Sequence, residues 1–198
     1  MSADPHGSAY QRFWSDVGVR FPDLGGAAST RLYAENERRL FSEHLAPLAG
    51  VRLLKTDLWD EIKNTRILAW ASRHGALAYG LDISLPTVLK AGHAFGSGSE
   101  RLRGVAADIR TVPFADASFD AIYSMGTIEH FEETERAIEE IARVLRPGGR
   151  AIVSVPNRWD PFLRPLLATA LQALGLYAYG YEKSYTAGHC GRCWSGPV

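Results

Sequence analysis

The sequence predicts an α/β fold built on a doubly wound, mostly parallel sheet. Short apolar segments alternate with longer segments of helical periodicity along most of the chain, and two of the apolar segments end in an aspartate. Strands that alternate with helices pair in parallel and have both sheet faces covered. Hydrophobic residues make up 46% and charged residues 22% of the 198 residues, which excludes wholesale disorder.

Charge and cysteine content narrow the class of protein further. Twenty-two Lys and Arg balance 22 Asp and Glu, so no global charge favours a nucleic-acid partner. Cys190 and Cys193 are the only cysteines, which predicts a reducing, cytoplasmic compartment rather than a disulfide framework. Residues 1–20 lack the apolar core of a signal peptide. We expect no membrane span and leave the oligomeric state open.

The first half of the chain predicts two strands and three helices. The first 28 residues show no clear period. A helix is expected from Ser29, capped by Ser29 or Thr30 and ended by Pro47 and Gly50. The next elements, in order, are a strand over 51–56, a helical stretch over 58–74, a strand over 76–81 that ends at Asp82, and a helix that begins near Ser84 and Pro86.

The second half continues the alternation. Residues 92–98 hold three glycines and predict a loop, and residues 113–118 predict a turn. The expected strands are 102–107, 119–124 and 150–155, and the expected helix is 132–146, ended by Pro147-Gly148-Gly149. Leucines over 163–174 recur on one side, which favours an amphipathic helix over a spanning one.

Two aspartates stand where such a sheet binds ligands, just after neighbouring strands. Asp82 and Asp108 each end a predicted strand, and ligands of open α/β sheets bind outside the carboxyl ends of the strands. A carboxylate there can accept hydrogen bonds from the two hydroxyls of a ribose or from the amino group of a purine. Either aspartate can instead simply cap the helix that follows it. Together they favour a nucleoside ligand.

The segment after the first strand argues against a pyrophosphate cofactor. Residues 55–61 read KTDLWDE, with no glycine and three carboxylates. Phosphate binding at this position relies on a G-x-G-x-x-G turn and an uncompensated helix N-terminus. NAD or FAD therefore fits poorly, whereas a ligand that carries an ammonium and a sulfonium group would suit these acids.

Four motifs give the chain a family resemblance. DIS at 82–84, ADIRTVPF at 107–114, SFDAI at 118–122 and LRPGG at 145–149 resemble class I S-adenosylmethionine-dependent methyltransferases, in the branch called methyltransferase type 11. The resemblance covers Val51 to Val155. It implies a Rossmann-like methyltransferase fold of seven strands, with S-adenosyl-L-methionine as cofactor.

The resemblance also implies roles for particular residues. Asp82, with Ile83 beside it, would hold the ribose hydroxyls, and Asp108-Ile109 would face the adenine. Met125 and Gly126 would line the methyl-donor pocket. Thr56-Asp57 stand in place of the family's glycine-rich loop, and Asp57 would reach the methionine ammonium of the donor.

The chain departs from the family at its C-terminal end as well as at the glycine loop. Few residues follow the leucine-rich helix, so we expect the last sheet strands to be missing or altered. The tyrosines of 176–185 are expected to form a substrate cover rather than a strand. The predicted organisation is an N-terminal helical extension (1–50), a cofactor-binding core (51–158), and a helix with an aromatic cover and tail (159–198).

His130 is the candidate catalytic base, for an acceptor that must lose a proton. The alternative is that it caps a helix or packs against the adenosyl group. His189, Cys190 and Cys193 are too few for a closed zinc site, so we expect no metal and an unstructured tail.

The leading hypothesis is methyl transfer to a small acceptor, possibly one with an apolar body. The alternatives are an inactive binding or assembly module that keeps the fold, and a nicotinamide-dependent oxidoreductase.

Overall fold

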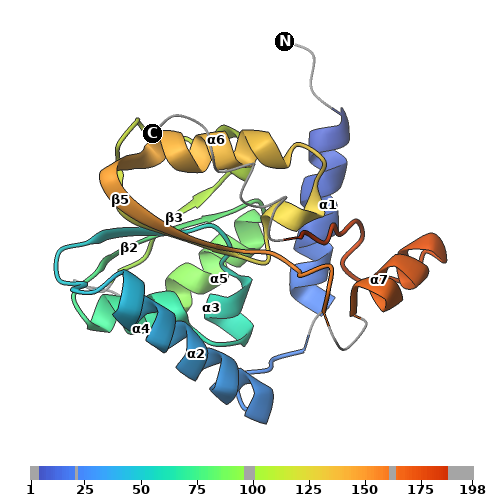
Figure 1. Cartoon of the computed structure of the whole chain (residues 1–198), viewed down its shortest axis with the longest axis horizontal. Coiled ribbons are helices and arrows are strands. Elements are labelled where there is room, and N and C mark those ends of the chain that lie inside the picture. Colours follow the sequence, from blue (N-terminus) through green and yellow to red (C-terminus); the bar gives the residue numbers. More distant parts are fainter. Residues whose placement is uncertain (1–4, 21, 96–100, 161–163, 187–198) are drawn as a thin grey trace.

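The computed structural model describes residues 5–20, 22–95, 101–160 and 164–186, and it contains one five-stranded parallel sheet (Figure 1). The strand order is β3-β2-β1-β4-β5, where the strands are β1 Arg52–Lys55, β2 Leu77–Asp82, β3 Arg103–Ala106, β4 Phe119–Met125 and β5 Leu145–Ser154. The chain winds outward from β1 to β3 and returns to β4 on the other side of β1. This arrangement confirms the doubly wound prediction, and the order reverses between β1 and β4.

Helices cover both faces of the sheet. They are α1 Pro5–Arg20, α2 Ala28–His44, α3 Trp59–Lys63, α4 Ile67–Arg73, α5 Leu85–Phe95, α6 Thr134–Val144 and α7 Arg164–Ala173, with 3₁₀ turns η1 Ile109–Thr111 and η2 Ile128–His130. Figure 1 shows α2, α3, α4 and α5 on one face and α6 on the other. Helices α1 and α7 lie toward one end of the strands.

The core consists of two apolar clusters, one on each face of the sheet. Successive side chains of a strand point to opposite faces. Accordingly Leu53 packs into the cluster formed with α2, α4 and α5, whereas Leu54 packs into the cluster formed with α6. Both leucines are almost completely buried. Because the central strands are buried on both faces, the residues that follow them have fixed positions.

The prediction of one helical stretch over 58–74 was wrong in one respect, because two short helices, α3 and α4, form there instead. The break falls between α3 and α4, where Arg66 adopts a left-handed backbone with φ of 57°. The buried Glu61 side chain accepts hydrogen bonds from the backbone N–H groups of Leu68 (2.9 Å) and Ala69 (3.1 Å). A side chain of α3 thus satisfies free N–H groups at the start of α4, which makes the break favourable.

Several predicted boundaries also needed correction. Residues 5–20 form a helix that no clear period indicated. The second helix begins after Ala27, and Thr30 donates to Leu24 O (2.7 Å) instead of capping. Gly92 lies inside α5, not in a loop. Strand β5 begins at Leu145, so the Pro-Gly-Gly segment bulges between the paired residues Leu145 and Arg150 instead of preceding the strand.

The described segment after β5 contains one helix followed by irregular structure. Residues 176–185 form no strand of the sheet, and the only β contact there is an isolated bridge between Asn157 and Tyr185. Helix α7 forms, but Leu166 and Leu174 are exposed, so the predicted leucine stripe is not a buried face. The predicted cysteine-containing tail lies outside the described residues. None of the helices described has the length and apolar character that a membrane crossing requires.

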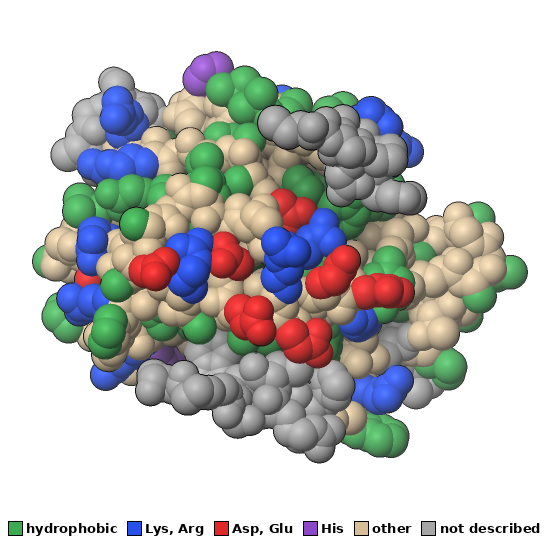
Figure 2. All heavy atoms as spheres, turned by 90° about the horizontal axis from the view of Figure 1, so that it is seen from above, with side chains coloured by type: hydrophobic (Ala, Val, Ile, Leu, Met, Phe, Trp, Pro, Cys, Tyr) green, Lys and Arg blue, Asp and Glu red, His purple; other side chains and the backbone are tan. Residues whose placement is uncertain are grey.

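Charges of both signs are mixed at the surface. Figure 2 shows acidic and basic side chains interspersed across one face of the molecule. Arg110, for example, pairs with both Asp108 and Glu133, and Arg143 pairs with Asp116 and Glu140. These ion pairs fit the equal numbers of acidic and basic residues in the sequence.

Candidate active site

The residues predicted for the site converge at the carboxyl ends of the strands. Thr56 and Asp57 follow β1, Asp82 ends β2 and Ile83 follows it, Asp108 and Ile109 follow β3, and Gly126 follows β4. All seven line one small cavity of about 80 Å³ together with Tyr10, Trp14, Leu81, Ala107, Thr127, His130 and Phe131. Met125, also predicted, lines a second cavity instead. The topology thus brings four separate chain segments to one place.

Asp82 is held in this cavity by two backbone amides. Its Oδ1 accepts a hydrogen bond from Ser84 N (2.8 Å) and its Oδ2 accepts one from Leu58 N (3.0 Å). Burial, and then the nearby charge of Asp57, raise the pKa of Asp82 to about 7. Each carboxylate oxygen has two lone pairs, so both oxygens can still accept from ligand hydroxyls.

Asp108 is engaged by a partner that the sequence analysis did not foresee. Arg110 donates to Asp108 through its backbone N (2.8 Å to Oδ1) and its guanidinium (Nη2 to Oδ2, 2.6 Å). Arg110 also donates to Glu133 (2.9 Å). An adenine amino group would share the Asp108 oxygens with this guanidinium, so its contact with adenine stays a prediction.

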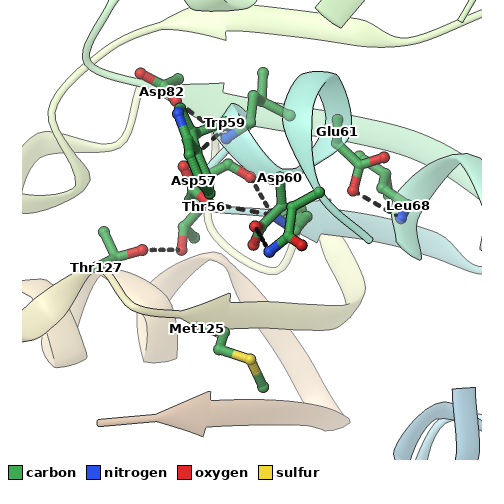
Figure 3. Close-up of polar contacts among 12 residues, drawn as sticks. Thr56, Asp57, Trp59, Asp60, Glu61, Leu68, Asp82, Met125 and Thr127 are labelled. Carbon is green, nitrogen blue, oxygen red and sulfur yellow. Dashed lines mark hydrogen bonds and ion pairs between the residues drawn. The ribbon is translucent and has the colours of Figure 1, made fainter. Parts of the chain in front are cut away.

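The loop after β1 is organised by side chains (Figure 3). Lys55 Nζ donates to the backbone carbonyl of Asp57 and forms ion pairs with Asp57 (3.4 Å) and Asp60 (3.6 Å). Asp57 Oδ1 accepts from Trp59 N (3.0 Å). Leu58 packs over Gly80, where an added Cβ would lie 2.5 Å from a Leu58 methyl carbon. The glycine at 80 therefore makes room for the loop.

His130 lies between the two cavities. It is 8% exposed, and its Nδ1 is 2.8 Å from the carbonyl oxygen of Tyr181. Because a carbonyl oxygen only accepts, Nδ1 carries the proton of this hydrogen bond, and in a neutral imidazole Nε2 is then the basic nitrogen. The Trp14 ring packs edge-on against the imidazole with centroids 4.7 Å apart.

The second cavity adjoins the first and is much larger, about 580 Å³. The two share walls formed by Trp14, Asp57, Asp82, Gly126 and His130. The remaining walls come from α2, α3, β4, α7 and the aromatic segment 176–185. They include Glu37, Trp59, Asp60, Met125, Leu167, Ala168, Leu171, Tyr177, Tyr179 and Glu182. Gly126, at φ of 72°, adopts a backbone that favours glycine where the cavities meet.

Sequence reasoning missed the contribution of α1. Tyr10 and Trp14 line the small cavity, and Gln11 Nε2 donates to Ile83 O (3.1 Å). Tyr10 and Trp14 stand four residues apart on one helix face, a spacing that was visible in the sequence. Nothing local indicated which part of the molecule that face would contact.

The sheet order and the acids at its carboxyl edge define a doubly wound nucleoside-binding protein with an adjoining cavity. Residues 63–153 match the sequence pattern of a protein family described as a methyltransferase domain. A demethylmenaquinone methyltransferase of Corynebacterium kroppenstedtii is 42% identical over 142 residues, covering 72% of this chain and 57% of the relative. A demethylmenaquinone methyltransferase of Clavibacter sepedonicus is 26% identical over 188 residues, covering 90% and 70%.

Solved structures agree on the fold. An S-adenosylmethionine-dependent methyltransferase from Mesorhizobium loti superposes with a TM-score of 0.61 at 20% identity, covering 81% of this chain and 77% of that one. Residues 63–153 thus match the methyltransferase domain family, and the described chain has the fold of S-adenosylmethionine-dependent methyltransferases.

The residues present fit the cofactor that this family uses. With the cofactor bound, both Asp82 oxygens would accept from ribose hydroxyls, and Ile83, Ile109 and Phe131 would form apolar walls for adenine. Asp57 offers a carboxylate where the small cavity opens into the large one, which suits the ammonium of a methionine group. At about 80 Å³ the small cavity is below the roughly 300 Å³ of a typical ligand site, so some of its walls would have to move apart for a nucleoside to enter.

Proposed function

We propose that this chain transfers a methyl group from S-adenosylmethionine to a small acceptor that has an apolar body. The observation that carries the proposal is the pair of adjoining cavities, one built around Asp82 and one large enough for an acceptor. A donor seated at the strand ends would direct its methyl group toward the larger cavity. The protein then contributes chiefly by holding both reactants close and aligned.

The walls of the larger cavity support an acceptor with apolar and aromatic character. Trp14, Leu171 and Tyr177 contribute flat or branched apolar surface to it, and its volume lies within the usual range for small-molecule sites. Both curated relatives described above are named for demethylmenaquinone, whose quinone ring and polyprenyl chain are such a body. The cavity also has several acidic side chains, among them Glu37 and Glu182.

His130 is proposed as the base for an acceptor that loses a proton on methylation. It lines both cavities, and the Tyr181 carbonyl holds its Nδ1 proton, so Nε2 is the nitrogen that would receive the acceptor's proton. S-adenosylmethionine supplies an electrophilic methyl group when bound. Removing the acceptor's proton increases the nucleophilicity of the atom that attacks it.

Isothermal titration with S-adenosylhomocysteine tests the proposal. We expect micromolar binding by the wild-type chain and at least a tenfold loss in Asp82→Ala, since two charge-assisted hydrogen bonds are lost. Asp116→Ala, a change of the same kind at a side chain that is 77% exposed, is the matched control. No binding by the wild type, or undiminished binding by Asp82→Ala, would sink the proposal.

The loop after β1 favours one second candidate, a non-catalytic binding module with the same fold. Its glycine-free sequence departs from the family pattern at the point where the donor's methionine end would lie. Transfer of a radiolabelled methyl group from the donor to any acceptor would eliminate this candidate.

A further inference from the structure

The loop between β1 and α3 lacks the glycines that the family pattern has at this position. A glycine-rich loop lets backbone atoms approach the donor closely, but here the loop residues are Thr56, Asp57 and Leu58, and α3 begins directly after them with Trp59 and Asp60. If the chain binds the donor as proposed above, another device must receive its methionine end.

Lys55 is the central feature of this loop. Its side chain is 1% exposed, and its ammonium contacts the Asp57 carbonyl and the carboxylates of Asp57 and Asp60. A buried ammonium is stable only when it is paired and hydrogen-bonded. Burial lowers the pKa of Lys55, but its acidic neighbours outweigh burial and raise it, so the group stays charged.

Asp57 is the one of these acids that faces both cavities. Its Oδ2 pairs with Lys55 and its Oδ1 accepts from Trp59 N, which together fix the direction of the carboxylate. Its side chain is 23% exposed and lines both the small and the large cavity. In Figure 3 Asp57 lies beside Asp82, the residue proposed for the ribose.

We propose that Lys55 is a positioning residue for the donor: it holds Asp57 so that this carboxylate receives the donor's methionine ammonium. The inference rests on the proposed donor site and assigns its amino-acid end. Side chains here replace the close backbone approach of a glycine loop. Lys55 faces two carboxylates, and of these Asp57 is the one that lines both cavities, where a cationic group can reach it.

The test compares two ligands that differ only at this end of the site. S-adenosylhomocysteine carries the amino-acid group, whereas 5′-methylthioadenosine carries the same adenosine without it. In Lys55→Met we expect the affinity for S-adenosylhomocysteine to fall at least tenfold, while the affinity for methylthioadenosine changes less than twofold. Titration calorimetry measures both, and circular dichroism confirms that the variant is folded.

Further variants separate a loss of the proposed contact from a loss of folding. Lys55→Met leaves buried carboxylates without their cation, so Asp57→Asn, at a partly exposed position, provides an independent route and should show the same selective loss. Because Lys55 acts through Asp57, adding Lys55→Met to Asp57→Asn should not change the ratio of the two affinities further. Lys90→Met, at an exposed position of α5, is the control and should leave both affinities unchanged.

An equal loss for both ligands would show that Lys55 only supports the fold, and unchanged binding of S-adenosylhomocysteine would also overturn the inference. If the wild type binds neither ligand, the proposed function itself fails, which is a distinguishable outcome.

Discussion

Asp82 is a buried carboxyl group with a fixed orientation and a raised pKa. Two backbone amides hold its oxygens, yet burial and the Asp57 charge raise its pKa to about 7. A raised pKa means that the carboxyl group keeps its proton to a higher pH than an exposed aspartate does. The ionised form, which accepts hydroxyl hydrogen bonds best, therefore predominates only above neutrality.

The affinity for S-adenosylhomocysteine should consequently increase with pH. If only ionised Asp82 binds, the competent fraction increases about tenfold between pH 6 and pH 8, and the dissociation constant falls by about the same factor. Titration calorimetry across this range measures the effect. Asp82→Asn should bind weakly and without this pH dependence. A flat wild-type profile, or the same slope in Asp82→Asn, would contradict the assignment.

At the residue scale, the sequence predicted those cavity residues that lie at the ends of strands. Thr56, Asp57, Asp82, Ile83, Asp108, Ile109 and Gly126 line the expected cavity because each follows or ends a strand of one parallel sheet. Residues contributed by distant segments were not predictable in this way. Trp14 from α1 and Glu37 from α2 reach the cavities through tertiary packing, and no local pattern encodes which helix face meets which edge.

At the element scale, the junction of α3 and α4 depends on Glu61. Both of its oxygens accept backbone N–H groups at the start of α4, and burial raises its pKa to about 7. The amide of Glu61→Gln has only one oxygen, so one buried N–H loses its acceptor, at a cost of about 1–3 kcal/mol. We expect urea unfolding at pH 8, where the wild-type carboxylate is ionised, to show this loss.

The matched control for that substitution is Glu43→Gln on α2, where the side chain is 56% exposed. It should change the free energy of unfolding by less than about 0.5 kcal/mol. Equal stability of Glu61→Gln and the wild type would mean that Glu61 does not hold the start of α4.

Helix α1 closes the small cavity through contacts that substitution can weaken. Gln11 donates to Ile83 O, and Tyr10 donates to His130 O at 3.5 Å. Gln11→Ala removes a hydrogen bond worth about 1 kcal/mol, which corresponds to roughly fivefold faster dissociation of S-adenosylhomocysteine. Stopped-flow tryptophan fluorescence measures that rate, with Arg12→Ala on the exposed side of α1 as control. Identical rates would argue that α1 does not gate the site.

Element predictions succeeded where one period extends over a buried segment and failed where tertiary contacts decide. The five strands and α6 were predicted from apolar runs and a stripe that the core buries. The single helix over 58–74 was wrong because Glu61 stabilises a break that no glycine or proline marks. The N-terminal helix was missed because its polar and apolar residues show no sustained period.

At the scale of the whole molecule, the sheet order explains why residues far apart in the sequence form one site. The reversal of strand order between β1 and β4 places the loop after β1 beside Gly126 and Thr127, and Thr56 Oγ1 lies 3.4 Å from Thr127 Oγ1. The fold class and this edge were predictable from the alternation of strands and helices. The closing of that edge by α1, α7 and the aromatic cover was only partly predictable, since it depends on packing between distant segments.

We propose that this edge of the sheet binds S-adenosylmethionine with its methionine end at Asp57. A crystal structure of the chain with S-adenosylhomocysteine is the most direct test. We expect ribose hydroxyls within hydrogen-bond distance of Asp82 and the ammonium within reach of the Asp57 carboxylate. A ligand bound elsewhere, or one whose amino-acid end points away from Asp57 with its ribose off Asp82, would contradict it.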